Sequence, residues 1–175
     1  MLKRIKEVFI KNYKWIICFI CLILFLALAE DVFNNEIMHG DVIGYKIIST
    51  YLIRDSLTPI FKIITWFGSA TCIILLALIL FFTIKNKKVG LLISTNLIII
   101  TILNQALKII VQRPRPTEYR IINEAGYSFP SGHSMVSMAF YGFLIYLIYK
   151  NIKNKYLKIS LIVILSLLIV MIGIS

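Results

Sequence analysis

The sequence has few charged residues for its length, and acidic residues are the scarcest of them. Asp, Glu, Lys and Arg make up 15% of the 175 residues, with 8 Asp and Glu against 19 Lys and Arg. Hydrophobic residues make up 59%, and the mean hydropathy is +0.89. This composition excludes a soluble domain of this size and indicates a protein that lies in a lipid bilayer.

Cysteine is also scarce, which limits metal and redox chemistry. The three cysteines, Cys18, Cys21 and Cys72, all fall in strongly apolar segments. Cys18 and Cys21 have the spacing of a metal or redox pair, but no second pair and no His lies near them in the sequence. We therefore interpret all three as reduced, apolar thiols, and we expect neither a metal site nor a cofactor.

Apolar runs long enough to cross a membrane account for most of the chain. A spanning helix needs about 20 mostly apolar residues, and four or five segments approach that length. No sizeable soluble domain, internal repeat or low-complexity tract lies between them. The sequence thus predicts an all-α, polytopic transmembrane helix bundle that forms a single integral membrane domain over residues 1–175. The expected spans are Trp15–Ala29, Thr58–Ile84, Val89–Val111, His133–Tyr149 and Tyr156–Ile174.

The net charge of +11 could indicate nucleic acid binding, but the positions of the positive charges argue against it. They gather at alternate ends of the expected spans, and the positive-inside rule assigns such clusters to the cytoplasm. The segments Glu30–Leu57 and Gln112–Pro130 then face outward. We expect a cytoplasmic N-terminus and no nucleic acid partner. The basic clusters are Lys3, Arg4, Lys6, Lys11 and Lys14; Lys85, Lys87 and Lys88; and Lys150, Lys153, Lys155 and Lys158.

The first apolar segment has two interpretations. A basic start, an apolar stretch and then Ala27-Leu28-Ala29 also fit a cleavable signal peptide. We favour a retained first span. The orientation expected for the later spans is the same in both cases.

A polar stripe lies in the expected span Val89–Val111. Thr101, Asn104, Lys108 and Gln112 recur at i, i+3, i+7 and i+11, which places them on one side of a helix. A charged residue at that depth is expected to face a cavity or a partner. The alternatives are hydrogen bonding between helices for Thr101 and Asn104, and a Lys108 side chain that reaches toward the membrane surface.

Two prolines end this helix and hold an arginine beside it. Pro114 and Pro116 each restrict the residue before them, Arg113 and Arg115, to an extended conformation. Lys108 and Arg115 are then two cations that can converge on one phosphate, Arg as a planar fork and Lys as a point charge. Arg113 is interpreted as a secondary or lipid headgroup contact.

A second polar group, Pro130-Ser131-Gly132-His133, precedes an apolar run. This pattern is typical of a helix start with Ser131 as the cap. Free backbone N–H groups at such a start attract anions, and Gly132 allows a close backbone approach. The alternative is a plain helix cap followed by a histidine.

These two groups resemble the first two signature motifs of the type 2 phosphatidic acid phosphatase superfamily of membrane lipid phosphatases. The first runs from Lys108 through six residues to Arg115-Pro116, and the second is Pro130-Ser131-Gly132-His133. The resemblance implies a metal-independent phosphomonoesterase or diphosphatase with a phosphohistidine intermediate. It assigns Lys108, Arg115, Ser131 and Gly132 to phosphate binding and His133 to the general acid that protonates the leaving alkoxide.

The family's third motif begins Ser-Arg and supplies a nucleophilic His and an Asp, and no match to it lies within residues 1–175. We expect the nucleophile beyond Ser175 and the chain to be a fragment with five spans of six. Alone, it is expected to bind phosphate weakly without turnover. Two other interpretations remain open: a non-catalytic membrane protein that binds lipid phosphate, and a transporter or structural bundle in which the motifs are coincidental.

The resemblance also implies the partners of the protein. The expected substrate is a lipid phosphate at the outer face of a bacterial cell membrane. Polyprenyl diphosphate, phosphatidic acid and phosphatidylglycerophosphate are not distinguished, and neither is a hydrolase from a phosphotransferase. The sequence leaves the oligomeric state open.

Overall fold

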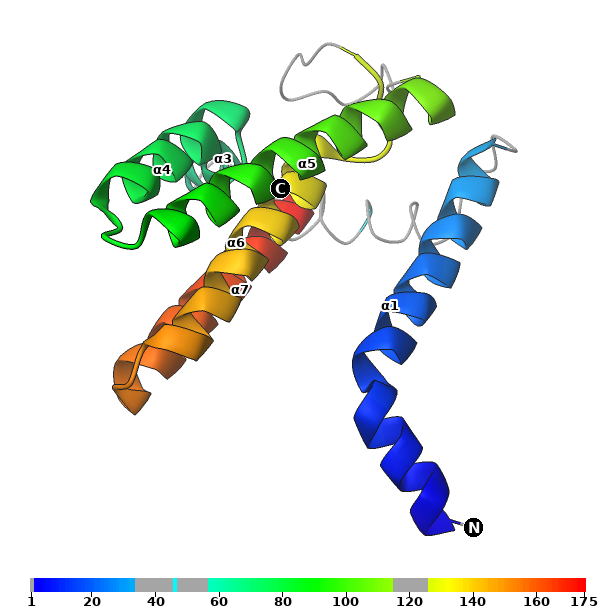
Figure 1. Ribbon diagram of the computed structural model, residues 1–175. Coiled ribbons are helices and arrows are strands. Elements are labelled where there is room, and N and C mark those ends of the chain that lie inside the picture. The colour runs from blue at the N-terminus through cyan, green and yellow to red at the C-terminus, as the bar shows by residue number, and fades with distance from the viewer. Residues whose placement is uncertain (1, 34–45, 47–56, 115–125) are drawn as a thin grey trace. The chain divides into compact units, whose positions relative to one another are not determined.

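The computed structural model describes residues 2–33, 46, 57–114 and 126–175, and the regular structure in these ranges is helical. Four helices are long and apolar enough to cross a membrane, or five if α3 and α4 form one bent span. The predicted all-α bundle of spanning helices is thus confirmed (Figure 1). The helices are α1 (Leu2–Phe33), α3 (Thr58–Phe67), α4 (Ala70–Thr83), α5 (Lys87–Val111), α6 (Gly132–Asn151) and α7 (Lys155–Ile174).

The chain divides into two compact units, residues 1–43 and 44–175. The first unit contains α1, a continuous helix whose stretch Asn12–Phe33 has the length and apolar character of a span. It is longer than the expected Trp15–Ala29 at both ends. A retained first span and a single domain over the whole chain both stay predictions.

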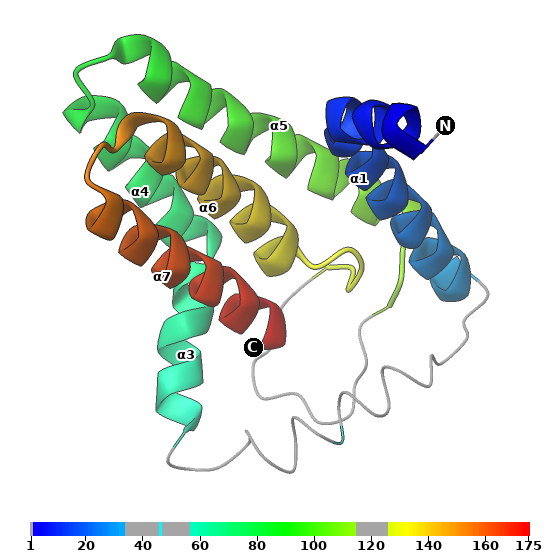
Figure 2. The same cartoon turned by 90° about the horizontal axis from the view of Figure 1, so that it is seen from below.

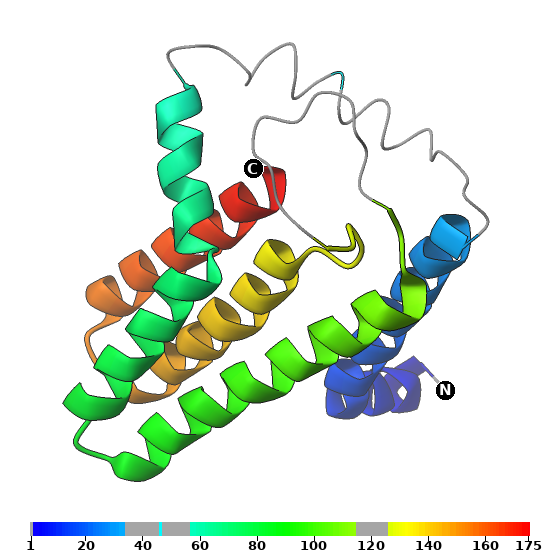
Figure 3. The same ribbon diagram turned by 90° about the horizontal axis from the view of Figure 1, so that it is seen from above.

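The second unit contains α3 to α7. Three-residue connections join α4 to α5 and α6 to α7, so the helices of each pair run antiparallel (Figure 2). Asn86 caps the start of α5, where its side chain accepts a hydrogen bond from the Lys88 N–H. Asn154 caps the start of α7 in the same way, with hydrogen bonds from the N–H groups of Tyr156 and Leu157. Both connections lie at the same end of this unit (Figure 3). The lysines of residues 85–88 and 150–158 therefore share one end, opposite the start of α6.

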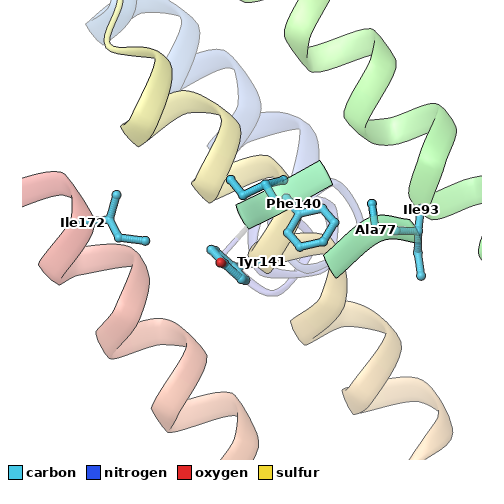
Figure 4. Packing of buried hydrophobic residues seen from close by; sticks show 6 residues of the cluster. Ala77, Ile93, Phe140, Tyr141 and Ile172 are labelled. Atoms are coloured by element: carbon cyan, nitrogen blue, oxygen red, sulfur yellow. The ribbon is translucent and has the colours of Figure 1, made fainter. Parts of the chain in front are cut away.

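A small core holds α4, α5, α6 and α7 together (Figure 4). The rings of Phe140 and Tyr141 meet edge to face, with centroids 5.3 Å apart. Large apolar side chains on the outside, such as Ile99 and Ile102, are exposed, as expected of helices that face lipid. Core residues come from all four helices: Ile73, Ala77, Ile93, Phe140, Tyr141 and Ile172.

The expected span Thr58–Ile84 is not one straight helix. It breaks at Gly68 and Ser69, and α3 and α4 meet at a bend of 49°. Ser69 caps the new helix by accepting a hydrogen bond from the Cys72 N–H at 3.2 Å. The Tyr141 hydroxyl of α6 donates to the Phe67 carbonyl at 2.7 Å, which satisfies a backbone group at the end of α3. Because bilayer lipid offers no hydrogen bonds, a break of this kind requires such partners.

Candidate functional site

The C-terminal half of α5 brings polar side chains to a pocket at the end of the bundle that lies opposite the lysine-rich connections. Thr101, Asn104 and Lys108 line it, as the polar stripe predicted. Gln112 does not, because α5 ends at Val111 and Gln112 adopts a left-handed conformation with φ 51°. Gln105 lines the pocket, and the polar stripe did not predict it.

The start of α6 forms the second wall. Ser131 is the residue that caps α6, as predicted, and its side chain accepts a hydrogen bond from the Ser134 N–H at 3.3 Å. The Ser134 hydroxyl lies 3.1 Å from the Ser131 hydroxyl. Gly132 and His133 form the first turn, so the N–H groups of the helix start lie in the same region as the His133 side chain.

The pocket has a volume of about 290 Å³ and joins four segments. Lys108 from the first motif and Ser131, Gly132 and His133 from the second all line it. Among the described residues its lining includes two basic side chains, Lys108 and His133, and no acidic one. The remaining lining residues are Gly68, Ala70, Ile73 and Ile74; Leu97, Thr101, Asn104 and Gln105; and Ser128 and Val136.

Asn104 joins the two motifs inside the bundle. It is 3% exposed, and its amide Nδ2 donates to the Pro130 carbonyl at 3.4 Å and lies 3.3 Å from the sulfur of Met135. A Cβ on Gly132 would stand 3.4 Å from Asn104 Oδ1 and 3.8 Å from Lys108 Nζ. The Lys108 ammonium therefore lies beside the backbone of the second motif.

Ser128 makes a second connection between the motifs. Its N–H donates to the Arg113 carbonyl at 2.9 Å, and its hydroxyl lies 3.1 Å from that carbonyl and 3.0 Å from the Pro114 carbonyl. These bonds fix the segment that leads directly into Arg115. Sequence reasoning missed Ser128, since nothing in its local pattern distinguishes it from a loop serine.

Arg115 lies outside the described residues, so its phosphate contact stays a prediction. Arg113 is described and is not part of the pocket lining. The described residues contain no group of three His, Cys, Asp or Glu side chains placed to hold a metal ion; metal independence also stays a prediction.

Comparison with known proteins identifies the family to which this chain is related. The family model of the PAP2 superfamily, the type 2 phosphatidic acid phosphatases, matches residues 72–175. The chain is 29% identical over 159 residues to phosphatidylglycerophosphatase B of Bacillus subtilis (strain 168), covering 87% of this chain and 77% of that protein.

A solved structure supports the same family relationship. The crystal structure described as the first transmembrane PAP2-type phosphatidylglycerolphosphate phosphatase, from Bacillus subtilis, matches with a TM-score of 0.72 and 28% identity, over 87% of this chain and 78% of that one. These relatives support a phosphoric ester hydrolase of the membrane that acts on a lipid phosphate. A family match over more than half of the chain, the same fold and the two motifs together identify the protein as a member of the PAP2 superfamily.

Proposed function

We propose that the protein hydrolyses a lipid phosphomonoester or diphosphate through a phosphohistidine intermediate, at the outer face of a bacterial cell membrane. One observation carries the proposal: Lys108 lies beside the capped start of α6, where His133 lines the same pocket. An ammonium group, the N–H groups of a helix start and an imidazole form a favourable environment for a phosphate ester. The absence of acidic side chains from the described lining favours an anion further.

Each group has a role in the proposed reaction. Lys108, Arg115, Ser131 and the Gly132 N–H hold the phosphoryl oxygens and stabilise the charge that develops on them. A nucleophilic His attacks phosphorus and forms an N–P bond while the bond to the lipid oxygen breaks. His133 gives its proton to the departing oxygen, which belongs to an alkoxide for a phosphomonoester and to a lipid phosphate for a diphosphate. Water then hydrolyses the phosphohistidine and releases inorganic phosphate. The proposal takes this nucleophile and its Asp from the third motif of the family, which has no match within residues 1–175.

The pocket is small relative to a lipid. At about 290 Å³ it lies near the lower limit for small-molecule sites, which suits a phosphorylated headgroup whose chains stay in the bilayer. The names of both relatives favour phosphatidylglycerophosphate over phosphatidic acid and polyprenyl diphosphate. The outward orientation is supported by the lysine-rich connections at the other end of the same unit.

The test uses the protein purified from its native membrane and placed in nanodiscs. Release of inorganic phosphate is measured from the three lipid phosphates in the presence of a metal chelator, and we expect phosphatidylglycerophosphate to be the best substrate. Lys108→Met and His133→Gln should each lower kcat about 100-fold or more. Lys158→Met, at the opposite end of the unit, serves as the matched control.

Two outcomes would contradict hydrolysis. Full activity of His133→Gln would remove the general acid from the mechanism. Binding of orthovanadate, a phosphate analogue, that depends on Lys108 but is accompanied by no phosphate release from any lipid would assign the protein to lipid phosphate binding without cleavage.

A further inference from the structure

Gly68, at the break between α3 and α4, lies against the candidate general acid. A Cβ placed on Gly68 would stand 3.1 Å from His133 Cδ2, 3.3 Å from Ser137 Oγ and 2.7 Å from Ile172 Cγ2. Backbone conformation does not require glycine here, because φ is −85° and ψ −8°, which any residue can adopt. The requirement is steric: only a hydrogen fits between α6 and α7 at this point.

The His133 side chain belongs to a row on α6 that faces this break. His133, Ser137 and Tyr141 follow one another at intervals of four residues, so they lie on one face of the helix. Ser137 is 0% exposed and Tyr141 is 2% exposed. The row is therefore pressed against the backbone around Gly68, with His133 at its pocket end.

Tyr141 fixes the break to the same helix. Its hydroxyl donates to the Phe67 carbonyl at 2.7 Å, one residue before Gly68. A carbonyl at the end of an interrupted span has no solvent to bond, so this hydrogen bond holds the break where it is. Tyr141, two helical turns beyond His133, therefore fixes the part of α6 against which Gly68 lies.

Contact at Cδ2 matters for the chemistry of the ring. Cδ2 is bonded directly to Nε2, so a neighbour that stops Cδ2 also limits where Nε2 can lie. Ile172 of α7 borders the same narrow space beside Gly68, with its Cγ2 2.7 Å from the position that a Cβ would take. The ring of His133 is thus confined on the side that faces α3 and α4.

We propose that the α3–α4 break is a positioning element for His133, in which Gly68 sets the limit for the imidazole edge and Tyr141 fixes Gly68 in place. This inference rests on the proposed function, since it concerns the residue to which we assign proton donation. Gly68 and Tyr141 are positioning residues that act through His133.

The test compares two glycine variants that introduce the same methyl group. Gly68→Ala places it against His133, whereas a Cβ on Gly142 of α6 meets nothing within 4 Å, so Gly142→Ala is the matched control. The protein carries ¹³C- and ¹⁵N-labelled histidine in nanodiscs. The His133 Cδ2–Hδ2 signal is assigned as the one that disappears in His133→Gln.

We expect Gly68→Ala to shift the His133 Cδ2–Hδ2 signal. The kcat for lipid phosphate hydrolysis should fall about 10- to 100-fold, because a small displacement of a reacting group is enough for such a loss. KM and the affinity for orthovanadate should stay unchanged. Gly142→Ala should match the parent protein in every measurement.

Two further variants separate positioning from loss of folding. Tyr141→Phe keeps the ring in the core and removes only the hydrogen bond, so it should shift the His133 signal with a smaller fall in kcat. Ile172→Ala combined with Gly68→Ala removes the side-chain atom at 2.7 Å, so the methyl group introduced at position 68 has room to move away from the ring. The double variant should return the His133 signal toward its parent position, whereas a variant that merely unfolds would become worse.

The inference is overturned if Gly68→Ala and Tyr141→Phe leave the His133 signal and kcat as Gly142→Ala does. It is also overturned if Ile172→Ala deepens the effect of Gly68→Ala. If the proposed function is wrong, His133→Gln retains full activity. The His133 signal of the Gly68→Ala protein then still reports whether Gly68 sets the position of the ring.

Discussion

The side chain of Asn104 and the carbonyl of Pro130 form a buried hydrogen bond of 3.4 Å that joins the helix of Lys108 to the turn of Ser131. Asn104 and Pro130 are 26 residues apart, and this bond is one of the contacts that bring the two motifs together. Asn104 also lines the pocket, one helical turn from Lys108. The Asn104 side chain therefore holds the two motifs together and also forms part of the pocket wall.

Replacing Asn104 with Leu, which has a similar shape, should loosen the site. The Pro130 carbonyl would lose a buried partner, a change that costs about 1–3 kcal/mol. We expect a lower midpoint of thermal unfolding and about 10-fold weaker binding of orthovanadate by calorimetry. Asn96→Leu on the same helix is the control, because Asn96 Oδ1 is buried without a hydrogen-bond partner among the described residues. Equal effects of the two variants would contradict a special role for Asn104.

Ser128 offers a test of how the first motif is held. Ser128→Ala removes the hydroxyl that lies 3.1 Å and 3.0 Å from the Arg113 and Pro114 carbonyls. The segment that enters Arg115 should become less fixed, and orthovanadate affinity should fall several-fold, since one hydrogen bond contributes about 0.5–1.5 kcal/mol. Ser128→Thr keeps the hydroxyl and should restore the affinity. Ser94→Ala, whose hydroxyl bonds within its own helix, should change nothing.

Gly132 allows binding and folding to be separated. A Cβ here meets Asn104 Oδ1 at 3.4 Å and Lys108 Nζ at 3.8 Å, which are ordinary contact distances. Gly132→Ala should therefore fold, with a thermal midpoint equal to or above that of the parent because Ala is the better helix former. The methyl group would occupy the space assigned to a phosphate oxygen, so orthovanadate binding should weaken about 10-fold or more. Unchanged affinity would show that phosphate does not approach the Gly132 backbone.

Hydropathy was sufficient to predict the helices, because a bilayer requires long apolar segments and little else in this sequence is long enough. It did not reveal the break at Gly68 and Ser69, where Thr58–Ile84 reads as one apolar run. A Gly-Ser pair is a known cause of kinks, but the pair alone does not show whether Tyr141, 74 residues away from Phe67, will bond the freed carbonyl. That bond depends on tertiary packing.

Local sequence rules predicted some residues of the candidate site, and only the tertiary structure revealed the others. Lys108 and residues 131–133 could be selected from the sequence, because helix periodicity and capping are local rules. Gly68, Gln105 and Ser128 could not, since their importance comes from which helix lies opposite them. The polar stripe stops at Lys108, because α5 ends at Val111 and Gln112 leaves the helical conformation.

The orientation of the site in the membrane gives the last prediction. The lysines of residues 85–88 and 150–158 lie at one end of the second unit and the pocket at the other, so the two ends should face opposite sides of the membrane. Cysteines introduced at Tyr127 and Lys153 report on the two ends, and both positions are exposed. In intact cells a membrane-impermeant maleimide should label Tyr127→Cys and leave Lys153→Cys unlabelled until the membrane is opened. The unmodified protein, with Cys18, Cys21 and Cys72, gives the background. Labelling of Lys153→Cys alone in intact cells would place the pocket on the cytoplasmic side, and the substrate would then have to be a lipid phosphate of the inner leaflet.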